Sequence, residues 1–199
     1  MERIIFKHEF KSYVFISSLG VLAGLLVAFF SQFPHDDLWS LALFSSMTCG
    51  FWICTCSLIA LFSSNQYAAG LNVALYVYFM FYVTGIFKRL AVVQHGYNTI
   101  SYFYNGFWQE LAYGLPYAVG CFALALVLWH GRKSKPMHTV VRFLPLVFIL
   151  AETVFLIIKV FTVKQGLFMS IVDTICAIAY GWIVINTSSK RGSRYIPTE

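Results

Sequence analysis

Charged residues are scarce in this chain. Asp, Glu, Lys and Arg make up 11% of its 199 residues, whereas 59% of the residues are hydrophobic. A typical soluble domain carries about 25% charged residues, so the composition excludes an ordinary soluble domain. The mean hydropathy of +0.73 indicates a chain that crosses a membrane several times.

The sequence also lacks familiar catalytic and metal-binding motifs. It contains no G-x-S-x-G, no H-E-x-x-H and no P-loop. Its five histidines, at positions 8, 35, 95, 130 and 138, are scattered and show no metal-ligand spacing. We therefore expect no metal and no other cofactor, and the sequence does not support enzymatic activity. A membrane-embedded enzyme that uses Glu152 as its acid stays open as an alternative.

Six apolar stretches approach the roughly 20 residues that cross the hydrocarbon core of a bilayer. They cover residues 12–31, 40–62, 71–87, 111–129, 143–162 and 168–187. No long polar stretch is left over for a separate domain. The sequence therefore predicts an all-α, polytopic integral membrane protein in which residues 1–199 form one six-helix transmembrane bundle.

The positive charges predict the orientation of this bundle. Three basic groups fall on one side of a six-span chain, and they comprise Arg3, Lys7, Lys11, Arg132, Lys133, Lys135, Arg142, Lys190, Arg191 and Arg194. Only Lys88, Arg89 and Lys164 lie in loops on the other side. By the positive-inside rule both termini are expected in the cytoplasm, with the protein in the cell membrane. The formal charge of +6 is thus explained by topology and not by nucleic-acid binding.

Small residues follow one face of the first apolar stretch. Gly20, Gly24 and Ala28 recur every four residues, which allows another helix to approach closely. That helix could belong to this bundle or to another membrane protein, and the sequence leaves both alternatives open.

Aromatic residues crowd the connection from Lys88 to Glu110 on the predicted outer side. One interpretation is an amphipathic segment that lies in the outer headgroup layer, where rings keep their polar tips near water. The other is a cap over an outward-facing cavity. In the second case the candidate ligand-binding residues are Tyr102, Tyr104, Asn105, Trp108 and Glu110.

Three charges lie inside the last two apolar stretches: Glu152, Lys159 and Asp173. Charges in the hydrocarbon core cost several kcal/mol unless they are paired or wetted, so they are candidate functional residues. Glu152 and Lys159 are seven residues apart and share a helix face. A tight turn around Gly166 would place Asp173 level with Lys159, which predicts an ion pair. Glu152 lies near the middle of its span with no basic residue expected at its depth.

These features favour recognition and transport of a small solute through an outward-facing pocket. In helix number, and in the small-residue face of its first helix, the chain is similar to the substrate-binding membrane subunits of energy-coupling-factor transporters. That resemblance implies solute uptake as the function. The alternative is a noncatalytic accessory or immunity protein that binds another membrane protein through Gly20, Gly24 and Ala28.

Overall fold

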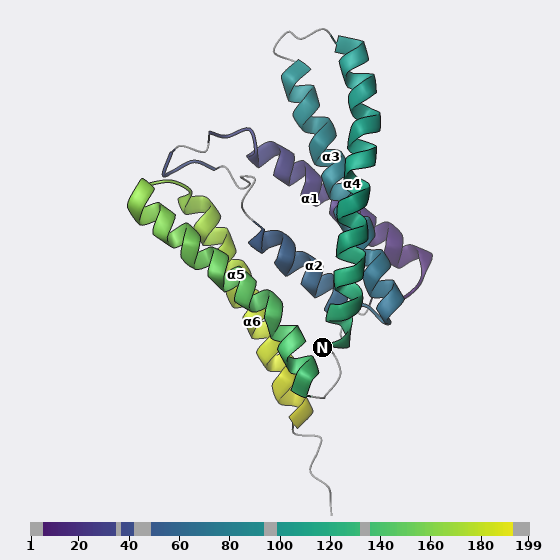
Figure 1. Cartoon of the computed structure of the whole chain (residues 1–199), viewed down its shortest axis with the longest axis vertical. Helices are drawn as coiled ribbons and strands as arrows, with labels where there is room; N and C mark the ends of the chain where they lie inside the picture. Colours follow the sequence, from purple (N-terminus) through teal and green to yellow (C-terminus); the bar gives the residue numbers. More distant parts are fainter. Residues whose placement is uncertain (1–5, 35–36, 42–48, 94–98, 132–135, 193–199) are drawn as a thin grey trace, which may run out of the picture.

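The computed structural model describes residues 6–34, 37–41, 49–93, 99–131 and 136–192, with side chains left out at 91–93, 99–105, 136–138 and 187–192. Over these residues the regular secondary structure is helical, apart from one isolated bridge between Phe6 and Ser63, and short turns connect the helices. The helices are α1 (Phe10–Phe30), α2 (Gly50–Phe62), α3 (Gln66–Val93), α4 (Thr99–His130), α5 (Pro136–Val163) and α6 (Leu167–Gly192), as Figure 1 shows. The all-α prediction is confirmed for the described residues.

Five of these helices are long and apolar enough to cross a membrane. The candidate spans are Phe10–Phe30, Gln66–Leu90, Gly106–His130, Thr139–Val163 and Leu167–Asn186. The protein is therefore a multi-pass membrane protein. The helix α2 differs, because its 13 residues extend only about 20 Å, whereas the hydrocarbon core is about 30 Å thick. A sixth span was expected over 40–62; residues 42–48 lie outside the described residues, and six crossings stay a prediction.

The long antiparallel hairpin of α3 and α4 corrects one sequence prediction. A separate aromatic segment was expected between Lys88 and Glu110, but α3 continues to Val93 and α4 already begins at Thr99. No proline interrupts this stretch, so each helix can extend into it. Figure 1 shows the hairpin projecting beyond the other helices.

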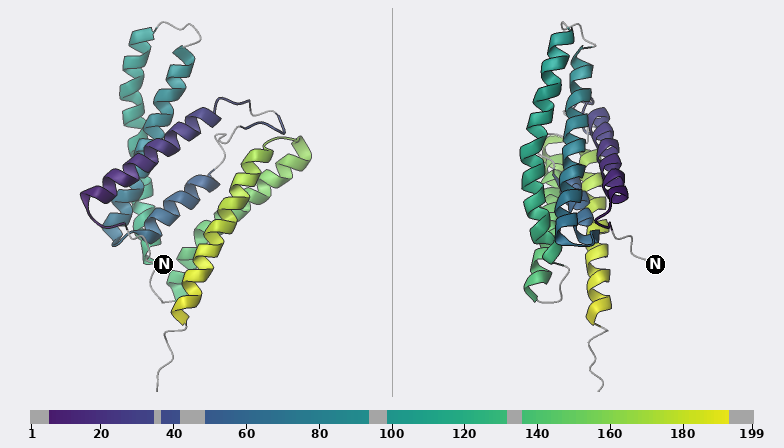
Figure 2. Two further views of the ribbon diagram at one scale, coloured as in Figure 1. Left: turned by 180° about the vertical axis from the view of Figure 1, so that it is seen from behind. Right: turned by 90° about the vertical axis from the view of Figure 1, so that its right-hand side faces the viewer.

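The short helix α2 lies between two helical hairpins. It contacts α3 and α4 on one side and α5 and α6 on the other, and the left-hand view of Figure 2 shows this placement from behind. One core cluster joins it through Ile59 and Ala60 to α1, α3 and α4. A second joins it through Cys54 and Leu61 to α5 and α6. The packing of the two hairpins into one bundle therefore depends on α2.

Phe6, at the start of the described chain, is hydrogen-bonded to the C-terminal end of α2. Phe6 N–H donates to the Phe62 carbonyl at 2.9 Å, and Ser64 N–H donates to the Phe6 carbonyl at 2.8 Å. These bonds bring the end of α2 back to the end of the bundle where α1 begins. At the other end of α2, Gly50 is buried and Cys49, which precedes it, is exposed.

The small-residue face of α1 packs against α3. A Cβ atom at Gly20 would lie 2.6 Å from the Tyr76 carbonyl oxygen, and one at Gly24 would lie 2.7 Å from the Met80 carbonyl oxygen. The Thr84 hydroxyl also donates to the Gly24 carbonyl at 3.1 Å. Ala28, on the same face, is buried. The helix that approaches this face therefore belongs to the same bundle, which was one of the two alternatives that the sequence left open.

Substituting alanine at Gly20 tests this packing. We expect Gly20→Ala to lower stability by about 1–3 kcal/mol, because the added methyl group meets backbone that cannot move aside alone. The matched control is Gly120→Ala, where an added Cβ has no neighbour within 4 Å. Thermal unfolding of both variants in detergent measures the difference. Equal melting temperatures would contradict the close contact of α1 with α3.

Candidate intramembrane acid site

The first turn of α2 faces two carboxyl groups that come from α5 and α6. The first N–H groups of any helix have no partner inside the helix. At α2 the Cys49 side chain supplies no cap, and the Cys49 N–H instead donates to Glu152 Oε1 at 2.5 Å. The Gly50 N–H faces the same carboxyl group. Glu152 therefore caps α2 from across the bundle, where its negative charge also complements the positive end of the helix.

Asp173 approaches the same helix end from α6. Both of its carboxylate oxygens lie 2.6 Å from the position that a Cβ atom on Gly50 would take. Only glycine leaves room for this approach. Asp173 is 4% exposed, and its Oδ2 atom has no hydrogen-bond partner among the described residues. We call Glu152 and Asp173 the acid pair.

The acid pair lies at membrane depth. Glu152 is near the middle of the candidate span Thr139–Val163, and Asp173 lies inside the span Leu167–Asn186. No described Lys or Arg forms an ion pair with either carboxyl group. Residues 42–48, which precede α2 in the chain, include no ionisable residue. Two acidic groups thus share one end of a short helix without a basic partner in the described part of the chain.

The expected ion pair between Lys159 and Asp173 does not form. Lys159 is half-buried on α5, and Asp173 points towards α2 instead. The spacing around Gly166 predicts that Lys159 and Asp173 lie at the same depth in the membrane. It does not predict how α6 is rotated about its own axis. That rotation follows the buried stripe of α6, on which Asp173 lies with Met169, Cys176, Ala177, Tyr180 and Val184.

Glu110 and Trp108, two of the candidates from the stretch Lys88 to Glu110, make their contacts outside the acid pair. Glu110 accepts a hydrogen bond from Arg89 Nε at 2.9 Å, and Arg89 Nη2 donates to Gln109 Oε1 at 3.0 Å. These contacts hold α3 and α4 together. Trp108 is 54% exposed on α4 and packs edge-on against Phe107. Tyr102, Tyr104 and Asn105 belong to α4, but their side chains lie outside the described part.

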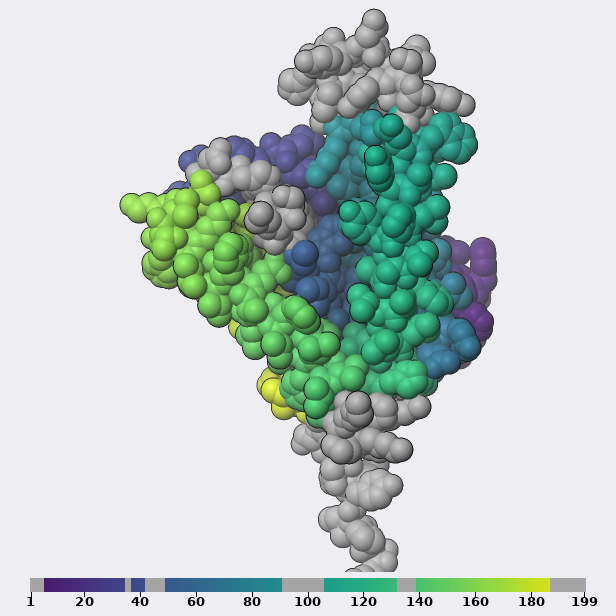
Figure 3. Space-filling model, viewed as in Figure 1, coloured from purple at the N-terminus to yellow at the C-terminus, as the bar shows by residue number. Residues whose placement is uncertain are grey.

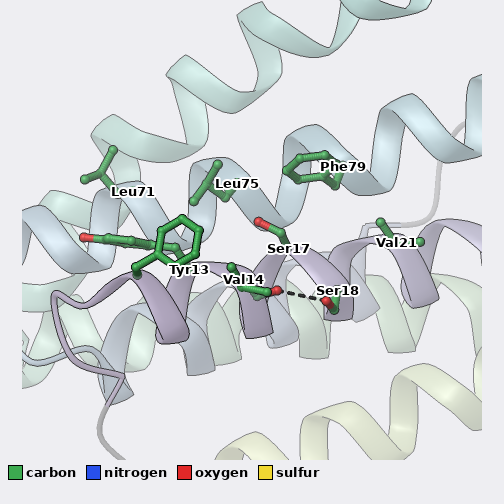
Figure 4. Close-up of a pocket in the computed structure, with 9 residues that line it drawn as sticks. Tyr13, Val14, Ser17, Ser18, Val21, Leu71, Leu75 and Phe79 are labelled. Carbon is green, nitrogen blue, oxygen red and sulfur yellow. Dashed lines mark hydrogen bonds between the residues drawn. The ribbon is translucent and has the colours of Figure 1, made fainter.

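A surface groove of about 540 Å³ lies between α1 and α3, and none of the predicted site residues is among the residues that line it. It is lined by Phe10, Tyr13, Val14, Ser17, Ser18, Val21, Leu71, Leu75 and Phe79 (Figure 4). Most of these side chains are apolar, and the Ser18 hydroxyl is used within α1, where it donates to the Val14 carbonyl at 2.9 Å. Because both walls belong to candidate spans, lipid chains can fill the groove.

Sequence reasoning found Glu152 and Asp173 but missed Cys49 and Gly50. The available signal was indirect: a glycine stands at the start of the apolar stretch Gly50–Phe62, where its lack of a side chain permits close approach. Nothing in the sequence pairs that glycine with acids more than 100 residues later.

A double-mutant cycle tests the contact between Gly50 and Asp173. We expect Gly50→Ala to lower the melting temperature by several degrees, because its methyl group overlaps the carboxylate. In the Asp173→Ala background the same change should cost much less, so the two effects should not add. As a control, Gly120→Ala and Asp173→Ala should combine additively. Additive losses for the first pair would show that Gly50 and Asp173 are not in contact.

Comparisons with models of protein families, with curated proteins and with solved structures found no match. The site is therefore interpreted from its own geometry. What the described helices support directly is a multi-pass, all-α membrane protein with an acid pair at the start of a short central helix.

Proposed function

We propose that the protein recognises a small cationic solute at the acid pair and transports it across the cell membrane. The observation that carries this proposal is Asp173, a carboxyl group buried at membrane depth whose Oδ2 atom has no described partner. Such a group in hydrocarbon costs several kcal/mol unless a positive charge or water compensates it. A cationic solute supplies that compensation while it is bound.

The short helix supports a transport role. In many transporters, substrate sites lie near the midplane of the bilayer, where helices are interrupted and their ends contact the substrate or ion. Here the N–H groups at the start of α2 are directed at Glu152. Because Glu152 already uses the positive end of the helix, Asp173 is the group that remains for a cation.

The arrangement of the hairpins supports access to this site. The hairpin of α3 and α4 and the hairpin of α5 and α6 diverge on either side of α2 (Figure 1). Part of α2 is visible between α5 and α4 on the face shown in Figure 3. Cys49 is exposed and Glu152 is half-buried, so the acid pair adjoins the protein surface. Rocking of one hairpin against the other about α2 would open the site to alternate sides.

Two other functions have less support. The accessory alternative relied on the small-residue face of α1, and that face is occupied by α3. The enzyme alternative centres on the same Glu152, and turnover of lipid in reconstituted bilayers would favour it over transport. As part of the transport proposal, we place both termini in the cytoplasm and the opening of the site on the outer side, as the resemblance to the energy-coupling-factor subunits implies.

A thermal-shift screen of the purified protein tests the proposal. The panel pairs primary amines, guanidines and quaternary ammonium compounds with neutral and anionic analogues of the same size. A ligand at 100 times its Kd stabilises a protein by about 2.7 kcal/mol, so a bound cation should raise the melting temperature by roughly 5–10 °C. Counterflow in proteoliposomes would then show whether the stabilising compound is transported.

Matched variants make this screen decisive. Glu152→Gln and Asp173→Asn should each abolish the shift, because they remove a negative charge from the acid pair and keep its shape. Glu9→Gln is the control, since Glu9 lies exposed at the start of α1. Shifts of equal size with neutral analogues, or shifts that survive in both variants of the acid pair, would contradict the proposal.

A further inference from the structure

We infer that the acid pair holds one exchangeable proton when no solute is bound, so that transport is coupled to protons. The inference rests on the proposed function for its coupling role. The proton itself can be detected whether or not a solute is known. It follows from how the two carboxyl groups share the start of α2.

The two acids have unequal partners at this helix end. Glu152 accepts from the Cys49 N–H and faces the Gly50 N–H. Asp173 presses both oxygens against the Gly50 position, yet its Oδ2 atom has no donor among the described residues. Two carboxyl groups that share one site do not readily ionise together. A proton on the acid pair removes one of the two negative charges, and it gives Asp173 a hydrogen to donate.

A proton fits this site better than a metal ion does. Calcium takes six to eight oxygen ligands, and magnesium demands near-ideal octahedral geometry. Among the described residues, no group of three or more His, Cys, Asp and Glu side chains could hold a metal ion. A proton needs only one carboxyl oxygen. The few ligands at this site therefore favour the proton.

None of the described ionisable groups that face Asp173 is a base that could take the proton from the acid pair. Its helix α6 packs against α2 and α5. From α2 and its cap the ionisable neighbours are the thiols of Cys54 and Cys49, from α5 the neighbour is Glu152, and from α6 itself it is Cys176. All of these are acids. Lys159 forms no ion pair with Asp173, so no described cation takes the place of a proton.

Transport would be coupled to protons because a proton and a cationic solute compensate the same negative charge of the acid pair at different times. With the proton bound, the acid pair keeps one negative charge, which Glu152 shares with the N–H groups of α2. With a cationic solute bound, the solute compensates the second charge and the proton can leave. The ionised pair without either ligand is the costly state at membrane depth. Exchange of a proton for a cation therefore avoids that state.

Infrared spectroscopy of the whole protein in detergent tests this inference without any ligand. A protonated carboxylic acid has a carbonyl stretch that is separate from the bands of carboxylate. We expect the wild-type protein to show this band at mildly acidic pH and to lose it as the pH rises. Asp173→Asn should remove the band, and Glu9→Gln should leave it unchanged.

Two spectroscopic results would contradict the bound proton. A wild-type spectrum without a pH-dependent acid band, or a band that survives unchanged in both Asp173→Asn and Glu152→Gln, would overturn the inference. Retained circular dichroism of the helices shows that each variant is folded. If a cationic solute stabilises the protein but the band is missing, the proposed function stands and only the proton coupling fails.

Discussion

The rest of the structure depends on how the start of α2 is held inside the membrane. A helix of 13 residues cannot span the hydrocarbon core by itself, and its first N–H groups need acceptors that lipid does not offer. Glu152 provides one acceptor through the 2.5 Å bond from the Cys49 N–H. Because α2 also contacts α3, α4, α5 and α6, this bond helps to hold the two hairpins in one bundle.

The same arrangement links stability to function. Gly50 lets Asp173 come within a distance that any side chain would prevent, and the buried Oδ2 atom is left without a described partner. Glu152 already accepts from the Cys49 N–H, so capping of α2 does not require the second carboxyl group of Asp173. In the proposed function that second carboxyl group binds the cation.

The sequence predicted much of this fold because the governing constraints are local. Hydrophobic length identified five spans, and the cost of charge in hydrocarbon singled out Glu152 and Asp173. The failures concern geometry between helices. Helix α3 extends to Val93 and α4 begins at Thr99, because the stretch from Lys88 to Glu110 contains no proline. The ion pair of Lys159 with Asp173 is absent because α6 turns its buried stripe towards α2. Contacts such as Cys49 with Glu152 depend on tertiary packing across 103 residues.

Disulfide cross-linking in native membranes tests the central claim most directly. The variant keeps Cys49, carries Glu152→Cys, and has alanine at the other four cysteine positions. If α2 begins against the middle of α5, mild oxidation should join positions 49 and 152 within one chain, as peptide mass spectrometry would show. The control Ile158→Cys, at a 55% exposed position on α5, should give no link to position 49. A link to position 158 but not to position 152 would contradict this placement of α2.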